Sequence, residues 1–185
     1  MNGTEPTPSD LRLLSPEELE RLGERSLRDH LVAQAVVAHA KHGPLTEASI
    51  PAYVADRSCI RHPLRLVFEI GNMASHQFAE PDIDWRSSDE HARVLYLRPV
   101  FKRFPELVPL ALSYMIPLVN YGRIVSDDLC ILYGATVSGC LVEEYYEAIC
   151  RMADRVGACS REREEAPTGS ACSGGQRVAA PPIHP

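Results

Sequence analysis

The sequence lacks the motifs that identify several classes of protein. Its 185 residues contain no Cys-x-x-Cys, no Gly-x-Gly-x-x-Gly and no Walker-type phosphate loop, so redox and nucleotide-binding motifs are missing. Gly-x-Ser-x-Gly is also absent, and with it the usual frame for a nucleophilic serine. No motif supports a particular cofactor, and the missing catalytic signatures favour a non-catalytic protein.

Concentrated positive charge is lacking too. The chain has 19 Lys and Arg against 25 Asp and Glu, a net charge of −6, and no segment of it is clearly basic. Nucleic-acid binding normally requires clustered positive charge, which displaces counterions from the phosphates. We therefore expect neither a nucleic acid nor an anionic membrane to be a main partner.

Long apolar runs are absent as well. The longest weakly polar stretch, residues 107–122, contains Pro109 and Pro117 and is shorter than the roughly 20 residues needed to cross a bilayer. The start of the sequence, MNGTEPTPSD, is polar and acidic, unlike the basic and then apolar order of a signal peptide. These features predict a cytoplasmic protein whose 6 cysteines are reduced thiols.

Composition divides the chain into three parts. Residues 1–14 are polar and predict a flexible N-terminal leader. Residues 158–185 are rich in Pro, Gly and Ser and have few large apolar side chains to offset the entropy of ordering, which predicts a disordered C-terminal tail. Residues 15–157 are then expected to form a single helical domain.

Helix signals dominate this central part. Capping residues, prolines at first helical positions and apolar periodicity predict helices over residues 15–42, 46–57, 63–79, 88–98, 105–122 and 126–157. Strand signals are scarce, because no run alternates polar and apolar residues between turn dipeptides. We therefore predict an all-α protein, an irregular bundle of five to seven helices centred on residues 63–79.

The expected central helix carries a narrow polar stripe on an otherwise apolar cylinder. At about 100° per residue, the stripe consists of Arg65, Glu69, Asn72 and His76. If the stripe faces water, these residues are ordinary partners four positions apart. If it faces inward, Glu69 and His76 are candidate metal ligands or acid–base groups. The exposure of Glu69 and His76 therefore discriminates between the two interpretations.

Two further places offer potential metal ligands. Cys59 and His62 have Cys-x-x-His spacing and could supply two zinc ligands, although no second pair of matching spacing is present. Glu143 and Glu147 lie on one side of the last expected helix, on a charged arc typical of a solvated face. The candidate metal ligands are thus Glu69, His76, Glu143, Glu147, Cys59 and His62.

Three functional interpretations follow. The first is a non-catalytic accessory or protein-interaction module, which requires a protein partner. The second is a helical-bundle metal-binding or redox protein with Glu and His ligands and, in one version, Cys. The third is a small-ligand-binding regulator with a pocket between kinked helices, beside Tyr114 and Tyr121. The first is the leading hypothesis, because the sequence lacks the motifs of the catalytic classes considered above.

Overall fold

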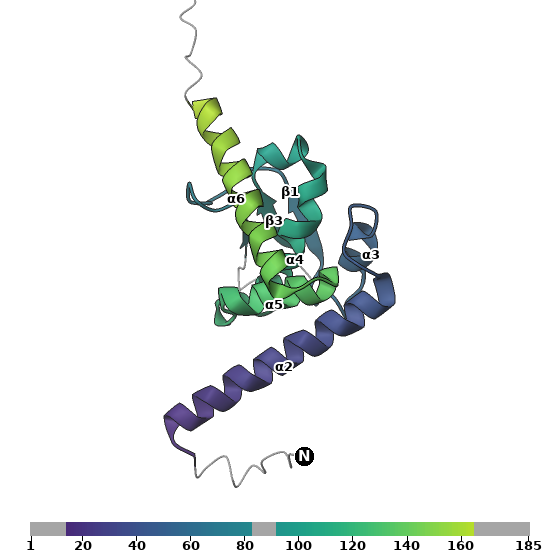
Figure 1. Ribbon diagram of the computed structural model, residues 1–185, viewed down its shortest axis with the longest axis vertical. Helices are drawn as coiled ribbons and strands as arrows, with labels where there is room; N and C mark the ends of the chain where they lie inside the picture. The colour runs from purple at the N-terminus through teal and green to yellow at the C-terminus, as the bar shows by residue number, and fades with distance from the viewer. Residues whose placement is uncertain (1–13, 83–91, 165–185) are drawn as a thin grey trace, which may run out of the picture.

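A computed structural model of the protein describes residues 14–82 and 92–164 (Figure 1). Its helices are α2 (Pro16–His42), α3 (Ile50–Ala55), α4 (Val108–Tyr121), α5 (Asp127–Ser138) and α6 (Val142–Glu164). Its strands are β1 (Leu64–Val67), β2 (Ala79–Asp82) and β3 (Arg93–Leu97). The described residues thus combine helices with a small mixed sheet, and the prediction of an all-α bundle is wrong.

Helix α2 starts and ends where the sequence predicts. Its first turn is a capping box, in which the Ser15 hydroxyl accepts from the Glu18 N–H and the Glu18 carboxylate accepts from the Ser15 N–H. The helix runs unbroken through Gly23 and ends at His42, and the residue after it, Gly43, has a φ of 72°. One side of α2 packs against α5 through buried Leu31, Ala35 and Ala38.

The segment predicted to be the central helix, residues 63–79, is not helical. It forms β1, a series of turns and the first residue of β2. Gly71 has a φ of 55° in these turns, and a Cβ added there would lie 3.0 Å from Cγ of Tyr96. A residue with a side chain fits this position poorly, so the close approach of Tyr96 requires the glycine.

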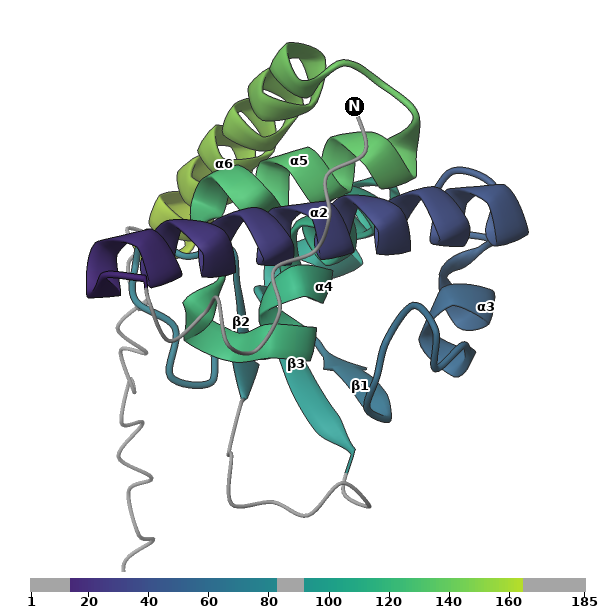
Figure 2. The ribbon, with the colours of Figure 1, turned by 90° about the horizontal axis from the view of Figure 1, so that it is seen from below.

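Strand β3 occupies the centre of the sheet, whose order is β1-β3-β2 (Figure 2). It pairs in parallel with β1, where Leu66 faces Leu95, and antiparallel with β2, where Ala79 faces Leu97. Leu95 and Leu97 are fully buried, whereas Val94 and Tyr96, which alternate with them, are only half-buried. This alternation is the period of two of a strand, and it overturns the helix predicted over residues 88–98, of which 88–91 lie outside the described residues.

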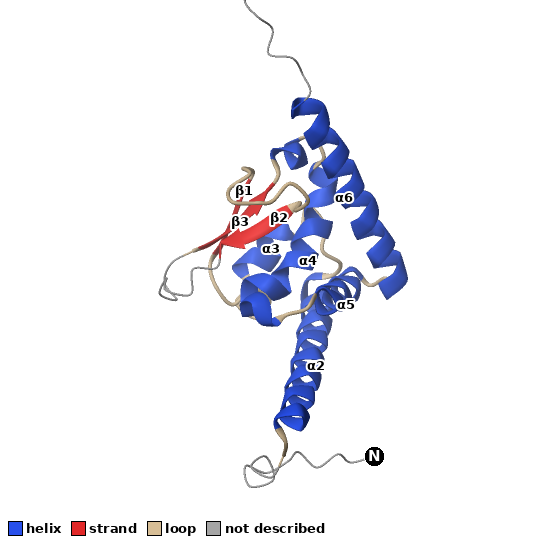
Figure 3. Ribbon diagram, turned by 90° about the vertical axis from the view of Figure 1, so that its left-hand side faces the viewer, coloured by secondary structure: helices blue, strands red, loops and turns tan. Residues whose placement is uncertain are grey.

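Helix α4 is the buried centre of the molecule. Most of its residues are buried, and it lies between the sheet on one side and α5 on the other (Figure 3). The single helix predicted over residues 126–157 is two helices, because Gly139, with a φ of 70°, ends α5. Helix α6 continues past residue 157, while the rest of the predicted tail and nearly all of the predicted leader lie outside the described residues.

No helix within residues 14–82 and 92–164 is both long enough and apolar enough to cross a membrane.

Candidate metal centre

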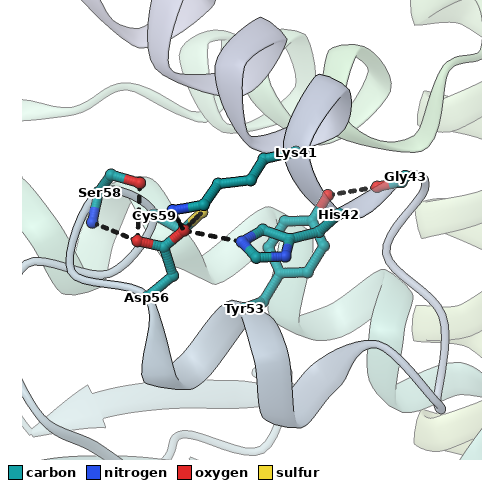
Figure 4. Close-up of polar contacts among 7 residues, drawn as sticks. All are labelled: Lys41, His42, Gly43, Tyr53, Asp56, Ser58 and Cys59. Atoms are coloured by element: carbon teal, nitrogen blue, oxygen red, sulfur yellow. Dashed lines mark hydrogen bonds and ion pairs between the residues drawn. The ribbon is translucent and has the colours of Figure 1, made fainter.

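Three side chains with metal-binding atoms converge where α2 meets α3 (Figure 4). They are His42, Asp56 and Cys59, and in the described part of the chain their ligand atoms all lie within 4.8 Å of one another. His42 is the last residue of α2, Asp56 follows the last residue of α3, and Cys59 lies in the next turn. The group thus joins three consecutive pieces of local structure.

Tyr53 fixes the angle at which α2 and α3 meet. Its side chain is fully buried, and its hydroxyl donates to the Gly43 carbonyl at 2.5 Å. The Tyr53 ring also lies against the His42 imidazole, with the ring centroids 5.1 Å apart. These two contacts hold the end of α2 over α3, so that His42 reaches Asp56.

Asp56 is the centre of the group. Its Oδ1 accepts from the Ser58 N–H at 2.9 Å and the Ser58 hydroxyl at 2.7 Å, which orients the carboxylate. Its Oδ2 lies 2.6 Å from Lys41 Nζ, 2.7 Å from His42 Nε2 and 3.7 Å from Cys59 Sγ. Three potential donors therefore converge on a single carboxylate oxygen.

The charges of the group follow from these contacts. The hydrogen bonds from Lys41 and then His42, together with those from Ser58, hold the pKa of Asp56 far below its usual range. Burial and then the Asp56 charge raise the pKa of the Cys59 thiol to about 11. At neutral pH the group therefore consists of an ionised carboxylate and a protonated thiol, which is not activated as a nucleophile.

Helix α4 supports the group from behind. Asn120 is buried, its Nδ2 donates to the Cys59 carbonyl at 2.9 Å, and its Oδ1 accepts from the Arg61 N–H at 3.0 Å. The backbone on both sides of residue 60 is therefore fixed to α4. This fixes the position of Cys59 independently of the contacts made by its thiol.

The donor set suits a borderline transition-metal ion. Imidazole nitrogen, carboxylate oxygen and thiolate sulfur are the ligand atoms of Zn²⁺ sites, and three of them leave a fourth position for water. The side chains of His42 and Asp56 are 16% and 12% exposed, so an ion can enter from solvent. The Lys41 side chain is 54% exposed, and its ammonium can move away from Asp56.

The structure places most of the sequence-predicted ligands elsewhere. Glu69 and His76 are exposed in the turns between β1 and β2, which is incompatible with the buried centre proposed for them. Glu143 and Glu147 are exposed on α6, and Glu147 pairs with Arg151 at 3.2 Å. None of these four residues belongs to the group at the junction of α2 and α3.

Among the residues predicted as ligands, Cys59 is the one that belongs to this group of described residues. Its expected partner His62 is half-buried and is not a member of the group. Neither His42 nor Asp56 is among the ligands predicted from the sequence. His42 had a weak signal as a histidine in the last helical turn, and Asp56 had one in its Asp-x-Ser spacing to Ser58, which is typical of a side-chain-closed turn.

A cavity of about 910 Å³ lies between α4 and strands β2 and β3. Tyr121 lines it, as the small-ligand interpretation expected, whereas Tyr114 is not among its lining residues and donates to Asp127 at 2.9 Å. Glu80 also lines it, and its Oε2 is buried without a hydrogen-bond partner among the described residues. Ligand binding in this cavity stays a prediction.

Comparisons with known protein families, with curated proteins and with solved structures return no match for this chain.

Proposed function

We propose that the protein binds one divalent transition-metal ion of the Zn²⁺ class through His42, Asp56 and Cys59. The observation that carries this proposal is the convergence of Lys41, His42 and Cys59 on Oδ2 of Asp56. An ammonium group, an imidazole and a thiol here surround one carboxylate oxygen. A metal cation bound to that oxygen would take the place of the ammonium group and of the protons. The arrangement supports the metal-binding interpretation with a different set of ligands from that expected.

Metal binding exchanges protons for the ion. Cys59 loses its thiol proton, His42 Nε2 presents its lone pair, and the Lys41 ammonium leaves Oδ2 for solvent. A bound dication favours the thiolate, which reverses the effect that the Asp56 charge has on Cys59 in the metal-free protein. The ion therefore displaces protons, and its affinity should rise with pH.

The bound ion would join α2 to the turn after α3. Since Asn120 fixes the Cys59 backbone to α4, the ion would also connect α2 with the buried centre of the molecule. Binding to the folded state alone stabilises that state by about 2.7 kcal/mol at a free-ion concentration of 100 times the dissociation constant. We infer a structural or sensory role for the ion, in which it stabilises this junction.

Metal titration of the full, untagged chain tests the proposal. The protein is stripped with a chelator and titrated with Zn²⁺ in a calorimeter and with Co²⁺ in a spectrometer. One ion should bind per chain, with proton release and with a thiolate-to-Co²⁺ charge-transfer band. His42→Gln and Cys59→Ser should each weaken binding by more than the roughly 10–100-fold that loss of an outer-shell partner costs.

Exposed residues of the same types provide matched controls. His30 and Cys150 are both exposed and lie outside the group, so His30→Gln and Cys150→Ser should leave the affinity unchanged. Lys41→Gln removes the competing ammonium and should strengthen binding several-fold. Absence of a bound ion in the unmodified protein, or equal affinity in a His42→Gln/Cys59→Ser variant, would contradict the proposal.

The accessory or protein-interaction function is a separate proposal. The observation that favours a protein partner is an apolar face of α2 that the described residues leave uncovered. This face is independent of the metal centre, because His42 belongs to the opposite side of the helix.

A further inference from the structure

Helix α2 has two apolar sides. One carries Leu31, Ala35 and Ala38 and is buried against α5. The other lies about 120–180° around the helix from Leu31 and consists of Leu19, Leu22, Ser26, Asp29, Ala33, Val36 and Ala40, here called the outer stripe. Its members recur at alternating intervals of three and four residues, which is the heptad spacing of a helix that pairs with another helix.

The outer stripe is open to solvent except at Leu22, which is half-buried. Leu19 and Val36 are 42% and 52% exposed, and the adjacent Val37 is 54% exposed. Figure 2 shows α2 in front of α4, α5 and α6, with no labelled element on the side remote from them. Five of its seven positions are leucine, valine or alanine, and an exposed stripe of apolar residues on a helix is a candidate interaction surface.

The stripe is complementary to itself when two copies run in opposite directions. If the twofold axis passes between residues 27 and 28, Leu19 faces Val36 of the second copy and Leu22 faces Ala33. At the centre, the Ser26 hydroxyl faces the Asp29 carboxylate, to which it can donate a hydrogen bond. A twofold axis makes every one of these contacts twice, so both polar residues of the stripe find partners.

The parallel arrangement does not have this complementarity. It would place Asp29 against Asp29 of the second copy, and two like charges in the seam repel each other. It would also place Ser26 against Ser26, so that neither Asp29 carboxylate receives a hydrogen bond from a serine. The positions of the two polar residues therefore select the antiparallel pairing.

We propose that the outer stripe of α2 binds the same stripe of a second copy of this chain, forming an antiparallel helix pair with Ser26 facing Asp29. The interface is an interaction surface whose partner is the protein itself. It leaves His42, Asp56 and Cys59 on the other side of α2, so dimerisation and metal binding can be tested separately.

Analytical ultracentrifugation of the full chain tests the association. The unmodified protein should sediment as a dimer, and Val36→Glu should raise the dissociation constant by about 100-fold or more, because the change enters two layers. Val36 is exposed in the single chain, so this variant should still fold. Val142→Glu on α6 is the matched control, since Val142 is 40% exposed and lies outside the stripe.

Cysteine cross-linking tests the direction. In a background with Cys140, Cys150, Cys159 and Cys172 replaced by serine, an equal mixture of Leu19→Cys and Val36→Cys proteins should oxidise to a mixed disulfide dimer. Either protein alone should oxidise much more slowly, because the antiparallel pairing separates like positions. Rapid cross-linking of Leu19→Cys alone would establish a parallel pair and overturn the proposal.

Two other results would also overturn it. One is a monomeric unmodified protein at its highest soluble concentration. The other is a monomer that becomes a dimer when residues 1–13 are deleted, which would show that the chain's own N-terminal segment covers the stripe. Circular dichroism shows whether Val36→Glu is folded. If the folded variant dimerises as strongly as the unmodified chain, the proposed interface is wrong.

Discussion

At the scale of single residues, Gly134 determines how closely α5 and α6 approach. A Cβ at this position would lie 2.1 Å from Cζ of Tyr145, which is fully buried. The Tyr145 hydroxyl bonds to Ser113 at 2.8 Å and to the Leu110 carbonyl at 3.2 Å, so the ring has no free direction in which to move. The missing side chain of Gly134 is therefore a requirement of the packing.

Gly134→Ala should destabilise the protein by about 2–3 kcal/mol, because the added methyl group displaces a buried tyrosine and strains its hydrogen bonds. Urea denaturation followed by circular dichroism measures the change in the free energy of unfolding. Gly157→Ala is the matched control in α6, where a Cβ meets nothing within 4 Å. That variant should gain about 0.5–1 kcal/mol from helix propensity. Equal stabilities of the two variants would contradict the packing argument.

The candidate site shows at the same scale what single residues can predict. Cys59 was selected as a ligand from its type and its Cys-x-x-His spacing, and it lies in the group. His62 was selected with it and is not in the group. Its replacement, His42, is 14 positions away from Asp56 in the sequence. Their approach depends on the angle between α2 and α3, which the packing of Tyr53 fixes. The spacing of residues in the sequence does not predict this angle.

At the scale of elements, the turns between β1 and β2 depend on Arg98. Its guanidinium is almost fully buried and donates to the carbonyls of Ala74, Ser75 and Gln77 at 2.8, 2.7 and 2.5 Å. The single Arg98 side chain thus donates hydrogen bonds to three carbonyl groups that lie outside the strands and have no partner in the sheet. This replaces the hydrogen bonds that a helix would have made over residues 74–77.

Arg98→Lys should therefore lower the free energy of unfolding by about 2 kcal/mol, because an ammonium cannot span the three carbonyls as the planar guanidinium does. Native-state hydrogen exchange should show that the Met73 and Gln77 amides, which bond to carbonyls within these turns, lose at least about tenfold of their protection. Arg65→Lys is the control at an exposed position of β1. Unchanged protection in Arg98→Lys would contradict this role.

The elements also show which sequence signals were sufficient. The start of α2 was predictable, because Ser15, Pro16 and Glu18 form a local capping motif whose partners are three residues apart. Residues 63–79 were not, because an apolar run as short as β1 fits the periods of both a helix and a strand. Pairing with β3, whose residues are distant in the sequence, stabilises the strand conformation of β1 over a helix. Within β3, Val94 and Tyr96 are residue types that favour strands, and the prediction of a helix there gave them too little weight.

At the scale of the whole molecule, α4 connects the helical layer with the segment that enters the sheet. Asn120 makes this connection through its bonds to the Cys59 carbonyl and the Arg61 N–H. Both backbone groups would be left without these partners if the amide were removed. The same residue therefore stabilises the fold and positions Cys59 in the candidate metal centre.

Asn120→Ala should lower the free energy of unfolding by about 2–4 kcal/mol, since two backbone groups lose their partners. It should also weaken Zn²⁺ binding about 10-fold or more, as expected for a residue that positions a ligand. Urea denaturation and calorimetry measure the two effects in the same protein. Asn72→Ala is the matched control at an exposed position. A stability loss with unchanged Zn²⁺ affinity would exclude the positioning role.

The packing of α2 on α5 has a consequence for synthesis of the protein. A ribosome completes Pro16–His42 long before it reaches Asp127–Ser138. The apolar side of the nascent helix is therefore synthesised before the surface of α5 that buries it. During that interval Leu31, Ala35 and Ala38 are as accessible as the outer stripe. Chaperones that recognise apolar helices should therefore engage the emerging chain, and products that terminate before residue 127 should be rapidly degraded.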